Sequence, residues 1–187
     1  MRPTFWSGRK VLVTGHTGFK GAWLTLWLTH LGAKVVGLSL PPITSPNLFT
    51  QTKLEDLLTN QFIADVRDLD SITRTLDSVC PDIVFHLASQ TIVRQSYRSP
   101  VDTFLINIQG TVNLLEAIRR HNLAIPTVVV TSDKCYRNKE IGESFVESDA
   151  LGGGDPYSAS KACQDIVAES MCQSLFSGEG RIATARA

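Results

Sequence analysis

The fold is decided by one stretch of the chain, Val11-Leu12-Val13-Thr14-Gly15-His16-Thr17-Gly18-Phe19-Lys20-Gly21. It begins with a short run of apolar and β-branched residues, which is typical of a buried strand. Three glycines then follow at intervals of three residues, and apolar side chains recur at helical spacing over residues 20–31. The stretch therefore predicts a strand, a tight glycine turn and a helix in immediate succession.

The place of the glycines, between a strand and a helix, suggests a ligand. A turn without side chains lets a pyrophosphate approach the backbone, and the helix N-terminus offers free N–H groups and a partial positive charge. The plain alternative is a turn that only joins the two elements, because spaced glycines also occur by chance. We favour the first interpretation and expect a dinucleotide to contact the turn at Gly15, Thr17, Gly18, Phe19, Lys20 and Gly21.

Strand-like and helix-like segments alternate along the rest of the chain. Further strands are predicted at residues 35–38, 62–64, 83–87, 127–131 and 181–185, and helices at 69–79, 101–121 and 157–175. Continuous apolar strands are buried on both faces, which favours a parallel sheet with helices on each side. We expect an α/β fold, a doubly wound parallel sheet of the Rossmann type in three αβα layers, with residues 1–187 as one domain.

Composition argues against several classes of function. The chain has 187 residues, of which 43% are hydrophobic and 19% charged, and its formal net charge is +0. Because acidic and basic residues are interspersed, neither nucleic acid nor a membrane is an expected partner. The four cysteines form no Cys-x-x-Cys pair, so no metal site is expected. Without a secretory signal or a membrane-spanning run, a cytoplasmic location is expected.

Tyr157 and Lys161 form a Tyr-x-x-x-Lys pair at the start of a predicted helix. A separation of four residues places both side chains on one helix face, roughly 6 Å apart along the axis. A phenol with a pKa of about 10 is a poor base at neutral pH, but a neighbouring ammonium group favours the phenolate. We expect Lys161 to lower the pKa of Tyr157 so that the phenol can accept a proton.

The glycine turn and this pair together resemble the extended short-chain dehydrogenases/reductases, whose turn reads Thr-Gly-x-x-Gly-x-x-Gly. Asp65-Val66, Leu87-Ala88-Ser89-Gln90 and Asn107 match further segments of that family. The resemblance implies a cofactor site lined by these residues together with Ser39, Thr131, Tyr157 and Lys161. Asp65 would accept a hydrogen bond from the adenine amino group; a solvated loop aspartate is the alternative.

The end of the second predicted strand bears on which dinucleotide is bound. Ser39-Leu40-Pro41 lacks the acidic residue that marks NAD in the classical fingerprint. It also lacks an arginine that would bind the 2′-phosphate of NADP, and the nearest basic residue, Lys34, precedes the strand. The implied cofactor is therefore NAD.

Ser132-Asp133-Lys134 follows the fifth predicted strand. In the family, the hydroxyl residue at this place orients the sugar, and the two residues after it distinguish dehydratases from epimerases and simple reductases. An acid–base pair beside a tyrosine suits the elimination of water, because a proton leaves C5 while the C6 hydroxyl is protonated. Residues 130–138 and 14–24 resemble the CDP-glucose 4,6-dehydratases in particular.

The resemblance implies a reaction with five catalytic residues, Ser132, Asp133, Lys134, Tyr157 and Lys161. Tyr157, assisted by Lys161, would remove the C4 hydroxyl proton of CDP-glucose as hydride passes to NAD. Asp133 and Lys134 would then expel water across C5 and C6, with the assignment of acid and base between them open. Return of the hydride to C6 would give CDP-4-keto-6-deoxyglucose, a precursor for dideoxysugar and lipopolysaccharide O-antigen synthesis.

One departure from the family concerns length. The chain ends at Ala187, directly after the sixth predicted strand, whereas these enzymes continue into a smaller substrate domain. We expect the NAD-binding fragment of a longer enzyme that is a homo-oligomer, a dimer or higher. The alternatives are a non-catalytic dinucleotide-binding fragment, or a dehydratase or epimerase that acts on another nucleotide sugar.

Overall fold

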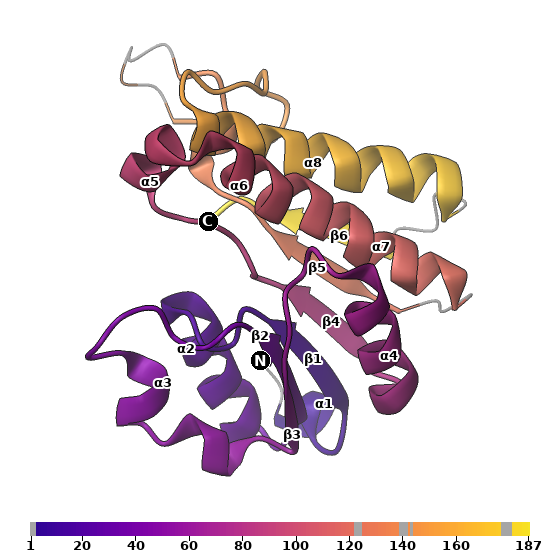
Figure 1. Cartoon of the computed structure of the whole chain (residues 1–187). Helices are drawn as coiled ribbons and strands as arrows, with labels where there is room; N and C mark the ends of the chain where they lie inside the picture. Colours follow the sequence, from indigo (N-terminus) through magenta and orange to yellow (C-terminus); the bar gives the residue numbers. More distant parts are fainter. Residues whose placement is uncertain (1–2, 122–124, 139–141, 143, 177–180) are drawn as a thin grey trace.

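The computed structural model describes residues 3–121, 125–138, 142, 144–176 and 181–187. At its centre is a parallel sheet of six strands in the order β3-β2-β1-β4-β5-β6 (Figure 1). The strands are β1 Lys10–Thr14, β2 Lys34–Ser39, β3 Asn60–Ile63, β4 Ile83–His86, β5 Thr127–Val130 and β6 Ile182–Ala185. The chain runs outward from β1 to β3 and then crosses back to β4, so β1 and β4 form the switch point at which open α/β sheets bind ligands.

Helices cover both faces of the sheet, which confirms the three-layer prediction. One layer contains α2 (Phe19–His30), α3 (Leu48–Gln51) and the 3₁₀ helix η1 (Leu54–Leu57). The other contains α4 (Leu69–Val79), α7 (Gly110–Arg120) and α8 (Pro156–Leu175), which lie side by side in Figure 1. The short helices are α1 (Pro3–Trp6), α5 (Val93–Arg98), α6 (Pro100–Phe104) and η3 (Asp133–Cys135).

Alternation along β1 divides the apolar core between the two faces. Leu12 packs with α4 and α7 residues such as Leu76 and Leu114, whereas Val11 and Val13 pack with Leu28 of α2. All six of these residues are at most 1% exposed. This two-sided burial is why the strands read as continuous apolar runs.

The predicted helix over residues 101–121 is interrupted. α6 and α7 are joined by a π-helical segment, η2 (Leu105–Gln109), which places the buried Asn107 in its middle. Single π turns within α-helices occur frequently at functional sites. The third strand also begins two residues earlier than predicted, because pairing of Val36 with Asn60 extends it through polar positions. In the part of the chain described, no helix has both the length and the apolar character to span a bilayer.

Candidate active site

The glycine turn joins β1 to α2 at the switch point of the sheet. Gly15 has a φ of +75°, and a Cβ atom there would lie 2.6 Å from the backbone nitrogen of Ala88, two residues after the end of β4. A Cβ atom at Gly21 would collide with the carbonyl oxygen of Gly15. These two glycines are therefore required by the packing of the turn against its own neighbours.

Gly18 has a different environment. Its φ of −77° suits any residue, and a Cβ atom there would meet only the Gly15 carbonyl oxygen, at 3.3 Å. Gly18 is the N-cap of α2 and provides no side-chain cap, and the first turn of that helix contains no acidic residue. The first N–H groups of α2 thus have no side-chain cap, which is the arrangement that suits a phosphate group at a helix N-terminus.

Thr17 ties this turn to the end of β2. Its hydroxyl donates to the carbonyl oxygen of Leu40 at 2.8 Å and lies 2.9 Å from the Ser39 hydroxyl. Because the single Thr17 proton goes to Leu40, Ser39 donates to Thr17 and keeps its lone pairs free to accept. Ser39 can therefore accept a hydrogen bond from a ribose hydroxyl, although it lacks the charge of the classical acidic residue.

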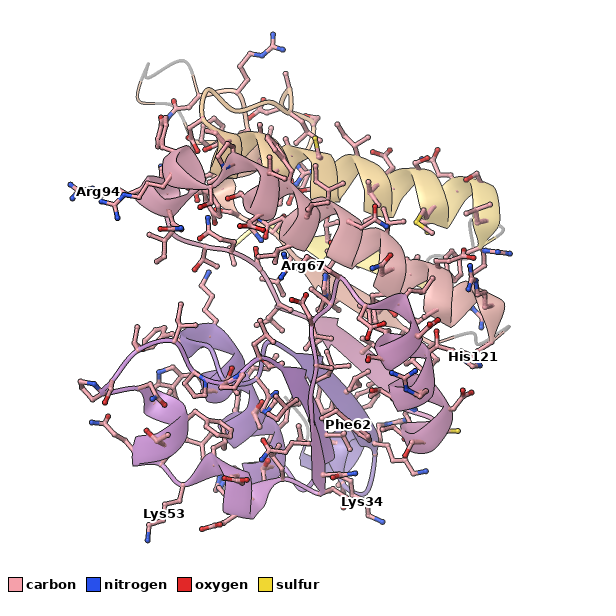
Figure 2. The ribbon with its side chains drawn as sticks, viewed as in Figure 1. Lys34, Lys53, Phe62, Arg67, Arg94 and His121 are labelled. Carbon is pink, nitrogen blue, oxygen red and sulfur yellow. The ribbon has the colours of Figure 1, made fainter. Side chains whose placement is uncertain are left out.

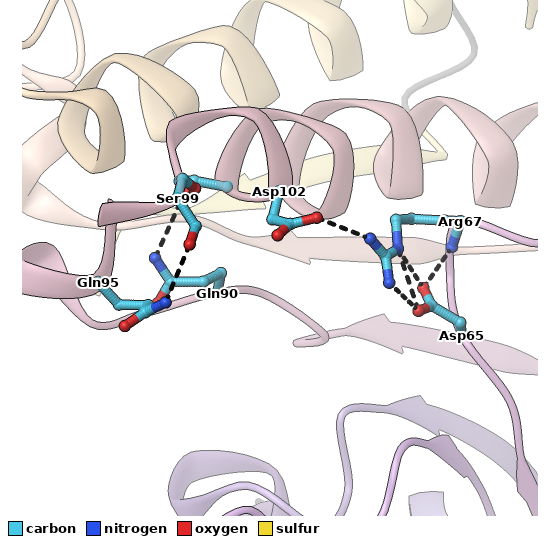
Figure 3. Close-up of polar contacts among 7 residues, drawn as sticks. Asp65, Arg67, Gln90, Gln95, Ser99 and Asp102 are labelled. Atoms are coloured by element: carbon cyan, nitrogen blue, oxygen red, sulfur yellow. Dashed lines mark hydrogen bonds and ion pairs between the residues drawn. The ribbon is translucent and has the colours of Figure 1, made fainter. Parts of the chain in front are cut away.

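Asp65, after β3, is part of an ion-pair cluster that the sequence did not reveal. Arg67 contacts both carboxylate oxygens of Asp65, the shortest contact being 2.7 Å, and reaches Asp102 of α6 at 3.1 Å (Figure 3). The bond to Arg67 lowers the pKa of Asp65. In the view of Figure 2, Arg67 lies toward the middle of the picture and Lys34 and Lys53 at its lower edge, and the Arg67 side chain is 38% exposed. Asp65 is thus an oriented carboxylate at the carboxyl edge of the sheet.

His86, the last residue of β4, belongs to a buried chain of hydrogen bonds. Thr111 donates its only hydroxyl proton to the Asn107 carbonyl oxygen at 2.7 Å, so the His86 Nε2 atom, 3.1 Å from Thr111, must donate. The His86 Nδ1 atom then accepts from Thr14 at 2.7 Å, and Thr14 accepts from the backbone N–H of Ala88 at 3.2 Å. Burial lowers the pKa of His86 to about 3, and the nearby Lys161 charge adds to this effect. A neutral histidine therefore fixes the loop after β4 beside the glycine turn.

Asn107 anchors the same loop to α8. Its side-chain oxygen accepts from the Ser89 hydroxyl at 2.8 Å and from the Gln90 backbone N–H at 2.7 Å. Its side-chain nitrogen donates to the Gln90 carbonyl oxygen and to the Ser160 hydroxyl, at 3.1 and 2.8 Å. Both the oxygen and the nitrogen of the Asn107 amide therefore have two hydrogen-bond partners within the protein. Asn107 thus holds Ser89 and Gln90, two of the predicted cofactor-binding residues, in place.

Ser132 and Tyr157 meet at the carboxyl end of β5. The Ser132 hydroxyl caps η3 by accepting from the Lys134 backbone N–H at 3.2 Å and donates to Asp133 at 3.0 Å, and it lies close enough to the Tyr157 phenol to lower the pKa of that group. Asp133 and Lys134 are exposed and line a cavity of about 560 Å³ with Tyr136, Gly153 and Ser158, among others. The carboxylate of Asp133 and the ammonium group of Lys134 therefore share one cavity, and Ser132 and Tyr157 adjoin its lining residues Asp133 and Ser158 in the sequence.

The expected effect of Lys161 on Tyr157 is corrected by the structure. Burial raises the pKa of Tyr157 above its ordinary value, and the Ser132 hydroxyl only partly offsets this. The Lys161 Nζ atom lies 6.0 Å from the centroid of the Tyr157 ring and donates to the Val130 carbonyl oxygen at 3.4 Å. Burial also lowers the pKa of Lys161 to about 7, so its charge is partial at neutral pH.

The remaining predicted residues occupy the same region. Leu87 is bonded through its N–H to the Thr14 carbonyl oxygen, and the Thr131 hydroxyl is buried with no hydrogen-bond partner among the described residues. Val66 instead packs inward, and a Cβ atom on Gly110 would lie 2.6 Å from its side chain. Within the described residues, no group of three or more His, Cys, Asp or Glu side chains could hold a metal ion.

Sequence reasoning missed several polar residues around this site. These are Arg67, Tyr136, Gln164, Asp165 and Arg186. One signal was available for Asp165, which follows Lys161 by the same four residues that separate Lys161 from Tyr157. The other residues have partners in distant parts of the chain, and Arg67 has in addition the nearby Asp65.

The structure combines three features: a parallel sheet in this strand order, a glycine turn at its switch point and a helix with the Tyr-x-x-x-Lys pair beside β5. Together they define a Rossmann-like domain of the short-chain dehydrogenase/reductase type. The chain belongs to the GDP-mannose 4,6 dehydratase family, whose model matches residues 12–176.

Several known proteins are similar to this chain. It is 45% identical over 172 residues to the CDP-glucose 4,6-dehydratase of Salmonella typhimurium, an alignment that covers 92% of this chain and 48% of that enzyme. A dTDP-glucose 4,6-dehydratase from Streptomyces venezuelae, solved with NAD bound, matches with a TM-score of 0.78 and 26% identity over 95% of this chain and 55% of its own. UDP-glucose 4-epimerase from Thermus thermophilus, solved with NAD, matches with a TM-score of 0.75 and 28% identity over 89% and 52%. The chain spans about half the length of the curated relatives it matches.

Proposed function

We propose that residues 1–187 form the NAD-binding Rossmann domain of a nucleotide-sugar 4,6-dehydratase that converts CDP-glucose to CDP-4-keto-6-deoxyglucose. The observation that carries the proposal is the contact between Ser132 and Tyr157, with Asp133 and Lys134 beside it at one cavity. The 45% identity to a CDP-glucose 4,6-dehydratase supports this substrate over other nucleotide sugars.

The glycine turn would hold NAD through its pyrophosphate, at the free N–H groups of α2 beside Gly18. Ser39 would accept from a ribose hydroxyl and Asp65 from the adenine amino group, since both have acceptor oxygens at the carboxyl edge of the sheet. Thr131 and residues 87–90 would line the cofactor site next to the nicotinamide, the part of NAD that accepts the hydride. Bound NAD would accept a hydride from C4 of the sugar and later donate one to C6.

The residues of this chain would handle the protons. Tyr157 would take the C4 hydroxyl proton, with Ser132 holding the sugar. To stabilise the phenolate, the Ser132 hydroxyl would turn its single proton from Asp133 to Tyr157. Because burial disfavours the phenolate, the positive charge near Tyr157 must increase when substrate and cofactor bind, and Lys161 in its protonated form provides part of it. Asp133 and Lys134 would share the acid and base roles of the elimination, with the assignment between them open.

The wider setting of the enzyme belongs to the same proposal. The coverage of about half of each curated relative supports a longer protein with a separate substrate domain that contacts the nucleotide. We expect that protein to form a homo-oligomer in the cytoplasm and its product to enter dideoxysugar and lipopolysaccharide O-antigen synthesis, as the resemblance to CDP-glucose dehydratases implies.

Mass spectrometry of the product tests the proposal. The longer protein that carries this domain, incubated with NAD and CDP-glucose, should release a sugar nucleotide lighter by one water. Parallel reactions with dTDP-glucose and GDP-mannose test the nucleotide, and chromatography with UDP-glucose detects epimerisation, which leaves the mass unchanged. No loss of water from CDP-glucose would overturn the assignment.

A second candidate function is a dinucleotide-binding module without activity of its own. The half-length coverage of the relatives favours it for residues 1–187 taken alone. In that case this chain binds NAD, as measured by calorimetry, but does not dehydrate CDP-glucose in the assay in which the longer protein does.

A further inference from the structure

A buried ion pair lies one helical turn beyond Lys161. Asp165 of α8 is 2% exposed, and its Oδ1 atom accepts from the Nε atom of Arg186 at 3.0 Å. Arg186 directly follows β6, so this pair joins the end of the last described strand to the helix that carries Tyr157 and Lys161. A buried carboxylate is tolerated only when such a partner compensates its charge.

The same guanidinium group also holds the connection between β5 and α8. Its Nη1 atom donates to the Tyr136 hydroxyl and to the Glu147 carbonyl oxygen, each at 2.9 Å. The group lies 4.9 Å from the centroid of the Tyr136 ring, and the Phe145 ring stacks on Tyr136 with centroids 4.7 Å apart. The planar guanidinium group of Arg186 therefore contacts three segments of the chain, at Asp165, Tyr136 and Glu147.

The segment held in this way contains the acid–base pair. Tyr136 donates its backbone N–H to the Asp133 carbonyl oxygen at 3.2 Å and bridges to Leu151, so its position sets that of η3. Cys135, between them, is fully buried next to Asp165. Asp133 and Lys134 thus have little freedom to move relative to α8 while the ion pair is intact.

We propose that Asp165 and Arg186 are positioning residues, which hold Asp133 and Lys134 in register with Tyr157 and Lys161 and balance the charge beneath Lys161. The part of this proposal that concerns dehydration rests on the proposed function. The part that concerns the charge of Lys161 can be measured on this chain without any substrate.

The groups that face Lys161 come from four elements. They are Lys20 of the glycine turn and α2, His86 of β4, Cys135 of η3, and Asp165 and Tyr157 of α8 itself. Burial and Lys20 lower the pKa of Lys161, whereas Asp165 raises it. Removing the Asp165 charge should therefore lower this pKa further. Removing the Arg186 charge leaves Asp165 uncompensated and should raise it.

Lysine NMR provides the test. The 187-residue chain, labelled at the lysine ε-carbons, is titrated as wild type, Asp165→Asn and Arg186→Gln, with the Lys161 signal assigned from Lys161→Arg. We expect the Lys161 midpoint to move to lower pH in Asp165→Asn and to higher pH in Arg186→Gln, each by on the order of one unit. The matched control Arg74→Gln, which removes an exposed guanidinium from α4, should not move it. A shift of both variants in the same direction, or of neither, would refute the charge balance.

A second variant, Arg186→Lys, tests the hydrogen-bond geometry of the guanidinium group separately from its charge. It also keeps the proposal testable if Arg186→Gln does not fold. It keeps the positive charge but loses the planar guanidinium group, so the Lys161 midpoint should stay within a few tenths of a unit while hydrogen exchange at the Cys135 and Tyr136 amides accelerates. In the longer protein, kcat for dehydration should fall roughly 10- to 100-fold with KM for CDP-glucose nearly unchanged, because displaced reacting groups slow chemistry more than binding. Unchanged exchange and unchanged kcat would refute the positioning role. If the wild-type protein does not dehydrate CDP-glucose, the proposed function fails, whereas the NMR and exchange results still decide this inference.

Discussion

The Lys161 ammonium group faces the ring of Tyr157, 6.0 Å from its centroid, and donates to the backbone of Val130. The two residues of the Tyr-x-x-x-Lys pair are therefore close without a direct bond between ammonium and phenol oxygen. Burial raises the pKa of the phenol and lowers that of the amine. Both groups are consequently held in their neutral forms more readily than in water, and ligands that bring charge into the site would change both.

Replacing Tyr157 by Phe should abolish oxidation of the sugar and leave the fold intact. The change removes one hydroxyl from a side chain that is 8% exposed, so the free energy of unfolding should change by about 1 kcal/mol. Formation of reduced NAD in a single turnover should fall at least about 100-fold, because the proton acceptor is lost. Tyr97→Phe, at a residue 64% exposed on α5, is the matched control. Retained turnover in Tyr157→Phe would remove the proposed role.

Gly15→Ala and Gly18→Ala should act on different properties. Alanine at Gly15 is strained by the positive φ and by contact with the Ala88 backbone, so the fold should lose more than about 1 kcal/mol in urea denaturation. Alanine at Gly18 has an ordinary φ and should alter stability little, but its methyl group occupies the phosphate side of the turn. Calorimetry should show NAD binding weakened at least tenfold in Gly18→Ala. Equal affinity in that variant and the wild type would argue against a pyrophosphate at this turn.

Stability should fall as the pH drops from about 6.5 toward 3, in part because of His86. Its pKa is about 3 in the fold and 6.5 in its ordinary state, so in this range the unfolded chain binds more protons. The loss attributable to one such group reaches about 1.4 kcal/mol per pH unit. His86→Gln should flatten the pH dependence of the free energy of unfolding, whereas His30→Gln, on the exposed side of α2, should not. His16, whose pKa is also lowered by burial, should leave a residual slope.

Asp65 and Asp102 both pair with Arg67, but only Asp65 is expected to contact adenine. Both pairs are partly exposed, so Asp65→Ala and Asp102→Ala should each change the free energy of unfolding by less than about 1 kcal/mol. NAD affinity should fall roughly tenfold in Asp65→Ala, because a charged acceptor is lost, and stay near wild type in Asp102→Ala. Equal losses in the two variants would instead indicate that Arg67 is the residue that matters for binding.

The sequence was most informative where local pattern and chemistry coincide. The strand, glycine turn and helix around residues 11–31 were predicted correctly, as was α4 over residues 69–79, whose N-cap Asp68 accepts from the N–H groups of Asp70 and Ser71. Asp155 likewise caps α8. Apolar periodicity and short-range hydrogen bonds determine such features, because all their partners lie within a few residues.

Features that depend on distant partners did not follow from the sequence. The early start of β3 depends on pairing with β2, and the π segment at Asn107 lies where that side chain binds Gln90 and Ser160. The raised pKa of Tyr157 was missed because four-residue spacing sets distance along a helix but says nothing about burial.

By itself, the sequence determined the order of strands and helices, the parallel sheet and the residue types at the glycine turn and on α8, because these depend on local periodicity and steric demands. Only the tertiary structure decided how charge is distributed around Lys161, how Arg67 reaches Asp102 and how Arg186 joins β6 to the segment after β5. Those properties arise from burial and from contacts between residues far apart in the chain, which no spacing along the sequence encodes.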